Sequence, residues 1–222
     1  MRKFIISIDA GTTSNRSILF DLKGNPVFSS QKEFTQYFPK SGWVEHDPDE
    51  IWRTTVKTLK DVIQKAKKLR GKILNIGITN QRETTVLWDK RTGKPVYNAI
   101  VWQDRRQEEF CAKLRKQNKD TMIFNKTGLL IDSYFSGTKI KWILDKIPKA
   151  KKLMNDDQLL FGTIDSFLIW RFTKGKVHAT DATNASRTMI YNITSNRWDD
   201  TILKLLKICL LYTSPSPRDT LL

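Results

Sequence analysis

Short apolar runs near the start of the chain end at polar turn residues. The runs cover residues 4–8, 17–20 and 27–34, and the turns between them contain Gly11 and Gly24. Apolar runs bounded by glycine, asparagine and proline are typical of strands joined by tight turns. The pattern therefore predicts an antiparallel meander of three strands.

The next segment carries the signals of a helix start. Asp47 is the expected N-cap, Pro48 occupies the first helical position and Glu50 the third, which predicts a capping box. Apolar residues then recur at helical spacing over residues 51–66, with lysines largely between them. His46, just before this start, is expected to be structural.

The rest of the chain alternates between strand-like and helix-like patterns. Strands are expected at 73–78, which reads as buried, at 84–88 and at 99–102; helices are expected at 105–116, 137–146 and 165–172, with an uncapped helix-like run at 201–207. Three strands, a helix, and then further strands and helices predict a mixed sheet flanked by helices, an α/β layer fold.

The net charge raises the question of a nucleic-acid partner. The 222 residues contain 39 Lys and Arg against 23 Asp and Glu, a net charge of +16. The densest basic stretch, residues 57–72, falls mostly on the solvent side of the predicted helix. No basic-aromatic motif of a nucleic-acid-binding module is present. A solvated, lysine-rich surface is therefore favoured over nucleic-acid binding.

Cysteine, histidine and hydropathy patterns exclude several classes of protein. Two cysteines and two histidines are too few for a disulfide framework or a structural zinc site. The N-terminus does not resemble a signal peptide, and no apolar stretch approaches the length of a membrane span. We expect a cytoplasmic protein without a membrane partner.

One polar turn between the first two predicted strands has the chemistry of a phosphate site. Its glycine allows close approach by a ligand, its hydroxyls and backbone N–H groups can donate to phosphate oxygens, and its arginine adds positive charge. Asp9, at a strand end, could hold Mg²⁺ through water. The candidate residues are Asp9, Gly11, Thr12, Thr13, Ser14 and Arg16. The alternative is an ordinary Thr/Ser-rich turn.

Several segments together resemble the glycerol-kinase family, which shares the actin-like, ribonuclease H-like fold of the sugar kinases. The resemblance rests on residues 9–16, 42–48, 77–84, 98–106, 127–129, 134–139, 180–181 and 183–188. The phosphate turn alone indicates only the superfamily. The sequence Gln81-Arg82-Glu83-Thr84, with Trp102 and Tyr134, is specific to the glycerol-using branch.

The resemblance implies transfer of the γ-phosphoryl group of MgATP to glycerol by a homo-oligomeric enzyme. Arg82 and Glu83 match residues that bind the glycerol hydroxyls, which suits a polyol because arginine donates and glutamate accepts hydrogen bonds. Trp102 and Tyr134 match residues that line the glycerol pocket. The candidates in the phosphate turn match contacts to the phosphates of ATP.

Each of these roles has a structural alternative. Arg82 and Glu83 could form a surface pair, and the two aromatic residues could belong to the core. Asp181 and Arg187 are more readily explained as residues that tie the domain together than as substrate contacts. Cys111, within a predicted amphipathic helix, is expected to be buried and inert.

The chain also departs from the family pattern. The family's general base is an aspartate in a Gly-Asp motif that opens a second, ATP-binding domain, and no Gly-Asp dipeptide occurs in this sequence. We therefore expect residues 1–208 to be the first domain and residues 209–222 to be an unrelated, unstructured or artefactual tail. We expect this chain alone to bind glycerol weakly without turning it over.

Two other functions remain open from the sequence. One is a kinase of another polyol or sugar in the same family, against which the specific residues at 81–84, 102 and 134 argue. The other is a non-catalytic, ribonuclease H-like module that binds nucleic acid through its positive charge.

Overall fold

The computed structural model describes residues 1–208, so the predicted tail at 209–222 lies outside the described residues. The chain forms two compact units. One consists of Met1–Gln36 and His46–Gln81; the other consists of Tyr37–Glu45 and Arg82–Leu222, described as far as residue 208. Within the described part, no helix has both the length and the apolar character needed to cross a membrane.

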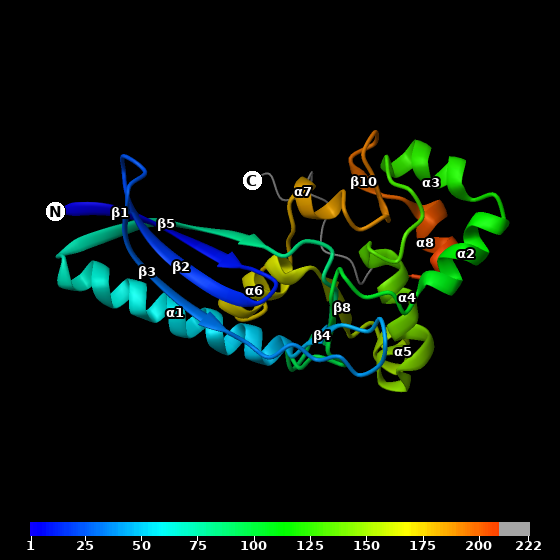
Figure 1. Ribbon diagram of the computed structural model, residues 1–222, viewed down its shortest axis with the longest axis horizontal. Helices are drawn as coiled ribbons and strands as arrows, with labels where there is room; N and C mark the ends of the chain where they lie inside the picture. The colour runs from blue at the N-terminus through cyan, green and yellow to red at the C-terminus, as the bar shows by residue number, and fades with distance from the viewer. Residues whose placement is uncertain (209–222) are drawn as a thin grey trace. The chain divides into compact units, whose positions relative to one another are not determined.

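A four-stranded mixed sheet organises the first unit (Figure 1). The strands β1 (Arg2–Ala10), β2 (Ser14–Asp21) and β3 (Pro26–Glu33) form the predicted antiparallel meander. The strand β5 (Gly71–Asn80) pairs in parallel with β1, which gives the order β3-β2-β1-β5. The mixed sheet is thus confirmed.

The helix α1 (Pro48–Lys68) packs along this sheet and contacts all four strands (Figure 1). Its predicted start is confirmed, because the Asp47 carboxylate accepts a hydrogen bond from the Asp49 N–H at 2.8 Å. The other half of the predicted capping box, in which the Glu50 side chain accepts from the backbone N–H of Asp47, is wrong. The Glu50 carboxylate instead accepts from the backbone N–H and hydroxyl of Thr35, at 3.2 and 3.3 Å.

The strand β5 is placed correctly by the sequence, but its predicted burial is wrong. Leu74 and Ile76 are 41% and 48% exposed. The reason is topological, because β5 is the outer strand of the sheet and has a neighbour only on the β1 side among the described residues. An apolar strand is buried only if another layer covers it, and the sequence of the strand does not contain that information.

The second unit is mainly helical. Its strands are β6 (Val86–Asp89), β7 (Ala99–Ile100), β8 (Leu159–Gly162), β9 (Tyr191–Asn192) and β10 (Arg197–Trp198), and β4 (Glu45–His46) spans the boundary between the units. Its helices are α2 (Glu108–Lys116), α3 (Asp120–Thr127), α4 (Ser136–Lys146), α5 (Pro148–Asn155), α6 (Ile164–Phe172), α7 (Ala182–Ala185) and α8 (Asp200–Leu206).

Most of these elements match the sequence expectations. The helices α2, α4 and α6 and the strand β6 lie where the periodicity indicates, whereas α3, α5 and β8 were not predicted. The expectation that the last helix lacks a cap is wrong. The Asp199 carboxylate accepts from the N–H groups of Thr201 and Ile202 at 3.0 and 3.1 Å, and Lys207 ends α8 in the left-handed conformation.

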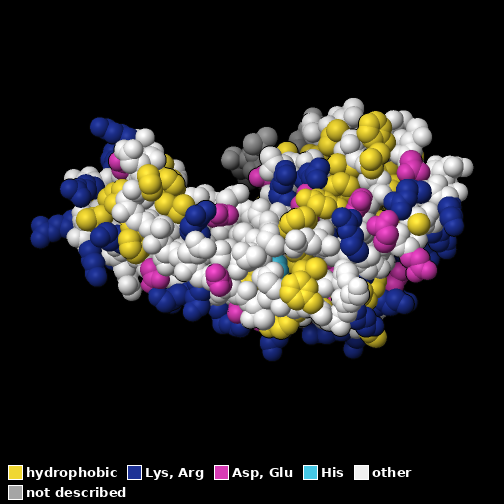
Figure 2. All heavy atoms as spheres, viewed as in Figure 1, with side chains coloured by type: hydrophobic (Ala, Val, Ile, Leu, Met, Phe, Trp, Pro, Cys, Tyr) yellow, Lys and Arg dark blue, Asp and Glu magenta, His cyan; other side chains and the backbone are white. Residues whose placement is uncertain are grey.

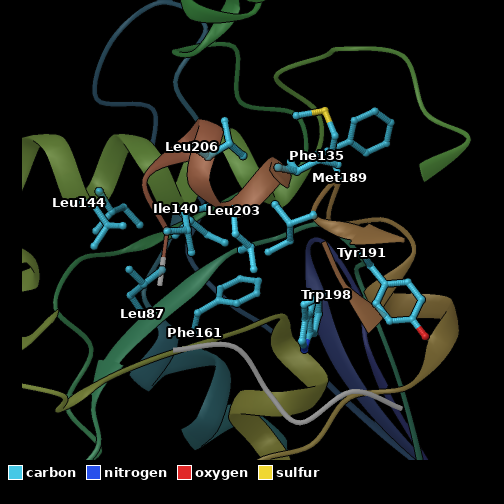
Figure 3. Packing of buried hydrophobic residues seen from close by; sticks show 14 of the residues in the cluster. Leu87, Phe135, Ile140, Leu144, Phe161, Met189, Tyr191, Trp198, Leu203 and Leu206 are labelled. Carbon is cyan, nitrogen blue, oxygen red and sulfur yellow. The ribbon is translucent and has the colours of Figure 1, made fainter. Parts of the chain in front are cut away.

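The core of the second unit draws side chains from nearly all its helices. Figure 3 shows residues from α4 and α8, such as Ile140 and Leu203, converging with Leu87 of β6 and Phe161 of β8. Phe135, at the start of α4, lies beside Met189 in the same view and belongs to this cluster. The core therefore fixes the segment around residue 135, which precedes α4.

Two further expectations concern single residues and the surface. Cys111 on α2 is buried and free, which confirms its predicted burial. Burial raises the pKa of its thiol to about 12, and its inertness stays a prediction. Lysine and arginine side chains are spread over the visible face of the molecule in Figure 2. This distribution is that of a solvated surface.

Candidate functional site

The candidate phosphate turn joins β1 to β2 in a tight hairpin. The Gly11 N–H donates to the Ser14 carbonyl at 3.0 Å and closes the turn. A Cβ at position 11 would lie 3.1 Å from that carbonyl oxygen, so a larger residue would strain the hairpin. Thr13 is exposed, and Thr12 and Ser14 are partly exposed. The side chains at these three positions therefore lie at the surface of the turn, and Ser14 Oγ accepts a hydrogen bond from Gln31 Nε2 at 2.9 Å.

Asp9 and Arg16 face each other across the same hairpin. They are register partners in β1 and β2, and Arg16 Nη2 donates to Asp9 Oδ2 at 3.0 Å. Both side chains are partly exposed. No cluster of three or more His, Cys, Asp or Glu that could hold a metal occurs among residues 1–208. Asp9 thus offers a single carboxylate, which suits only a metal that keeps most of its hydration shell.

Hydrogen bonds from Gln81, directly after β5, support this turn, and His46 of β4 contacts Gln81 in turn. The Gln81 N–H donates to the Ala10 carbonyl at 2.8 Å, and Gln81 Nε2 donates to the Gly11 carbonyl at 3.0 Å. His46 Nε2 lies 2.6 Å from Gln36 Oε1, and His46 Nδ1 lies 3.3 Å from Gln81 Nε2. The partners assign a neutral ring that donates from Nε2 and accepts at Nδ1.

Burial agrees with this assignment, because it lowers the pKa of His46 to about 4. These contacts support the prediction that His46 is structural.

The candidate polyol residues begin directly after β5. Arg82 is exposed, whereas the neighbouring Glu83 is buried. Glu83 has φ 63°, in the left-handed region that residues other than glycine seldom adopt. Two hydroxyls, Ser136 Oγ and Thr85 Oγ1, hold this backbone by donating to the Glu83 carbonyl, each at 3.0 Å. Strained backbone that is held in this way is often part of a functional site.

The Glu83 carboxylate has one strong partner. Its Oε1 accepts a hydrogen bond from Arg187 Nε at 2.7 Å. Among the described residues, no donor is bound to Oε2. Arg187 thus orients the carboxylate, and Oε2 is left to accept from a ligand hydroxyl.

The two aromatic candidates lie together beside this carboxylate. The ring centroids of Trp102 and Tyr134 are 5.4 Å apart, and the Arg187 guanidinium lies 5.6 Å from the Tyr134 ring. The backbone N–H of Trp102 also donates to Thr84 Oγ1 at 3.3 Å, which joins Trp102 to the segment that carries Glu83. The structure therefore brings Glu83, Trp102 and Tyr134 together, with Arg82 adjoining them in sequence.

A buried ion network anchors the loop that carries Trp102. Arg106 donates to Glu45 Oε1 at 2.7 Å and to Asp104 at 2.8 and 2.9 Å. Its guanidinium also stacks on the rings of Trp43 and Trp142, 3.8 and 4.5 Å from their centroids. Burial opposes the charged form, but the hydrogen bonds to Asp104 and Glu45 outweigh it and raise the pKa of Arg106.

Lys139, which was not predicted as a site residue, is fully buried on α4. Its Nζ donates to the carbonyls of Tyr134 and Phe135, the latter at 3.4 Å. A signal was present, because Lys139 is four residues from both Phe135 and Ile143 and so lies on the buried stripe of the helix. The helical spacing thus predicts that this lysine is buried, which is unusual for a charged residue.

Lys139 should make folding stability depend on pH in the alkaline range. Burial lowers its pKa to about 7. Between about pH 7 and the ordinary lysine pKa near 10.4, only the unfolded chain holds the extra proton. The free energy of unfolding should therefore rise by up to about 1.4 kcal/mol per pH unit in this window. Urea unfolding at pH 7.5 and 9 should show a weaker rise for Lys139→Met, and equal rises in both proteins would contradict the burial of an ionisable amine.

Comparison with known proteins gives the family of the chain. Residues 4–212 match the model of the FGGY family of carbohydrate kinases, N-terminal domain. The glycerol kinase of Malacoplasma penetrans is 60% identical over 207 residues, which are 93% of this chain and 41% of that protein. The glycerol kinase of Petrotoga mobilis is 58% identical over 208 residues, 94% of this chain and 42% of that protein.

Solved structures agree with this result. The Plasmodium falciparum glycerol kinase with ADP has a TM-score of 0.91 at 37% identity, over 96% of this chain and 42% of that one. The gluconate kinase of Lactobacillus acidophilus has a TM-score of 0.84 at 27% identity, over 96% and 42%. The predicted fold class, an α/β, ribonuclease H-like domain, is confirmed. The chain spans about two fifths of the length of these relatives, and it belongs to the FGGY family of carbohydrate kinases, whose N-terminal domain it matches.

Proposed function

We propose that this chain is the glycerol-binding, N-terminal part of a glycerol kinase. The observation that carries the proposal is the buried Glu83 carboxylate near the Trp102–Tyr134 pair, since one of its oxygens has no donor among residues 1–208. A small polyol needs an acceptor, a donor and apolar surface for its carbon chain. Glu83, the exposed Arg82 and the two aromatic rings supply these in turn. The similar glycerol kinases support glycerol as the polyol.

In the proposed reaction, the γ-phosphoryl group of ATP passes to a terminal hydroxyl of glycerol. The residues of this chain bind and orient the two substrates. Arg82 and Glu83 fix the hydroxyls, and the turn with Gly11, Thr12, Thr13, Ser14 and Arg16 donates to phosphate oxygens. A Mg²⁺ ion would neutralise charge on the phosphates, and Asp9, as a single carboxylate, fits a water-mediated contact to it.

Turnover by the complete enzyme would also need a general base, which the family resemblance assigns to an aspartate in a Gly-Asp motif. These 222 residues contain no such dipeptide. We therefore propose that this chain binds glycerol and that catalysis belongs to the longer protein. The low cysteine content favours a cytoplasmic reaction. The longer enzyme should be homo-oligomeric, which sedimentation velocity would test.

The first test is a glycerol titration of the purified 222-residue chain by amide NMR, with all glycerol excluded from the buffers. Glycerol should produce saturable shifts near residues 83, 102 and 134, and gluconate and D-xylulose should produce much smaller ones. A coupled assay should detect no ATP-dependent glycerol phosphorylation. Absence of saturable shifts would refute the binding proposal, and preferred binding of a sugar would favour the alternative kinase. Appreciable turnover would refute the division of roles.

A further inference from the structure

The interactions of Arg187 join two parts of the candidate polyol site. We infer that Arg187 is a positioning residue for polyol binding, which orients the Glu83 carboxylate and the Tyr134 ring. The inference rests on the proposed function, because it assigns a role within the same site. It also goes beyond the sequence expectation, in which Arg187 only ties the domain together.

Arg187 and Glu83 form a close ion pair. Arg187 Nε donates to Glu83 Oε1 at 2.7 Å, and the Glu83 side chain is 3% exposed. The contact is a charge-assisted hydrogen bond, which fixes the orientation of the buried carboxylate. With Oε1 bound by Arg187, Oε2 is the oxygen that can accept from a polyol hydroxyl. Arg187 thereby selects which oxygen faces the ligand.

Arg187 also contacts two aromatic rings. The Arg187 guanidinium lies 5.6 Å from the centroid of the Tyr134 ring and 5.0 Å from that of Phe135. These distances are within the range of cation–π attraction. Tyr134 in turn lies against Trp102. One cation therefore contacts the polar acceptor of the site and one of its aromatic walls.

Backbone contacts next to Arg187 fix its position beside Glu83 and Tyr134. The backbone carbonyl of the next residue, Thr188, accepts from the Gly137 N–H at 2.8 Å. A Cβ on Gly137 would lie 3.1 Å from that carbonyl and 2.9 Å from Ile190, so the two segments approach closely only because residue 137 is glycine. Phe135 and Met189 lie side by side in the core (Figure 3).

The Arg187 side chain itself is 29% exposed. The guanidinium is therefore reachable from solvent while the carboxylate that it holds is buried. A ligand that binds Glu83 Oε2 would lie close enough to Arg187 to change the surroundings of its Nε–H.

The test compares Arg187→Gln with Arg91→Gln in the full 222-residue chain. Arg91 is the matched control because it also pairs with a buried carboxylate, Asp89, at 3.1 Å, with side-chain exposures of 59% and 8%. Glycerol affinity, measured by amide NMR titration, should fall about tenfold or more for Arg187→Gln, as expected for loss of a charge-assisted hydrogen bond. It should be unchanged for Arg91→Gln.

A second variant and a spectroscopic measurement separate positioning from stability. Arg187→Lys keeps the cation but replaces the fixed Nε–H donor, so it should fold and still bind glycerol more weakly. In the wild-type chain, the Arg187 Nε–Hε NMR signal should shift as glycerol is added. A merely structural ion pair would give no such shift.

The outcomes distinguish the two proposals. Wild-type glycerol binding with unchanged affinity in both Arg187 variants, or with an unresponsive Nε–Hε signal, would overturn the positioning role and leave the proposed function intact. Absence of glycerol binding by the wild-type chain would overturn the proposed function and this inference with it.

Discussion

Replacement of Arg106 by methionine is expected to lower the free energy of unfolding by about 3–5 kcal/mol, as is typical when one partner of a buried ion pair is removed. The Arg106 side chain and its partners Glu45 and Asp104 are 1%, 3% and 1% exposed. Without the guanidinium, two carboxylates would remain buried with no cation between them. Urea or thermal unfolding followed by circular dichroism would measure the loss.

The adjacent Arg105 provides the matched control. It pairs with Asp132 at 2.8 Å, but both side chains are largely exposed. Exposed pairs of this kind contribute about 0–1 kcal/mol, so Arg105→Met should change stability little. If the two variants lose similar stability, the buried network does not hold the loop that carries Trp102.

The second large effect is expected on binding rather than on stability. Arg82→Met should weaken glycerol binding about 10- to 100-fold, because a hydrogen bond to a charged group typically contributes about 1.5–3 kcal/mol. Arg82 is exposed, and no side-chain partner for it occurs within residues 1–208. The free energy of unfolding should therefore change by less than about 0.5 kcal/mol.

An amide NMR titration together with urea unfolding of the same samples would measure both quantities. Lys90→Met serves as a control, since Lys90 is an exposed cation of the same unit. A glycerol affinity of Arg82→Met equal to that of the control would remove Arg82 from the proposed site. A large loss of stability would show that Arg82 is structural.

The sequence predicted elements best where local signals were strong. The predicted meander and α1 are confirmed. They were predictable because turn glycines, an N-cap and regular apolar spacing act within a few residues of one another. The strand at 73–78 shows the limit of such signals. Its residues favour a strand, but whether it is covered depends on what packs beside it, and that is decided by distant parts of a chain.

The candidate site divides in the same way. Arg82, Glu83, Trp102 and Tyr134 were found through the resemblance to a family, and the structure places the last three side by side. The partners that hold them were not identified as such. Arg187 is 104 residues from Glu83 in sequence, and no spacing rule joins residues that far apart. Only Lys139 left a local signal, as a charged residue on a buried helical stripe.

The left-handed backbone at Glu83 sets a local conformational cost against the contacts of a single side chain. At φ 63°, glycine would be free of the conformational penalty of about 1 kcal/mol that other residues carry there. Glycine, however, would leave the Arg187 guanidinium without its carboxylate partner and would remove the proposed acceptor of a polyol hydroxyl. Because losing one partner of a buried ion pair costs more than the relaxed backbone gains, heat resistance and polyol binding should both select for the strained glutamate at this position.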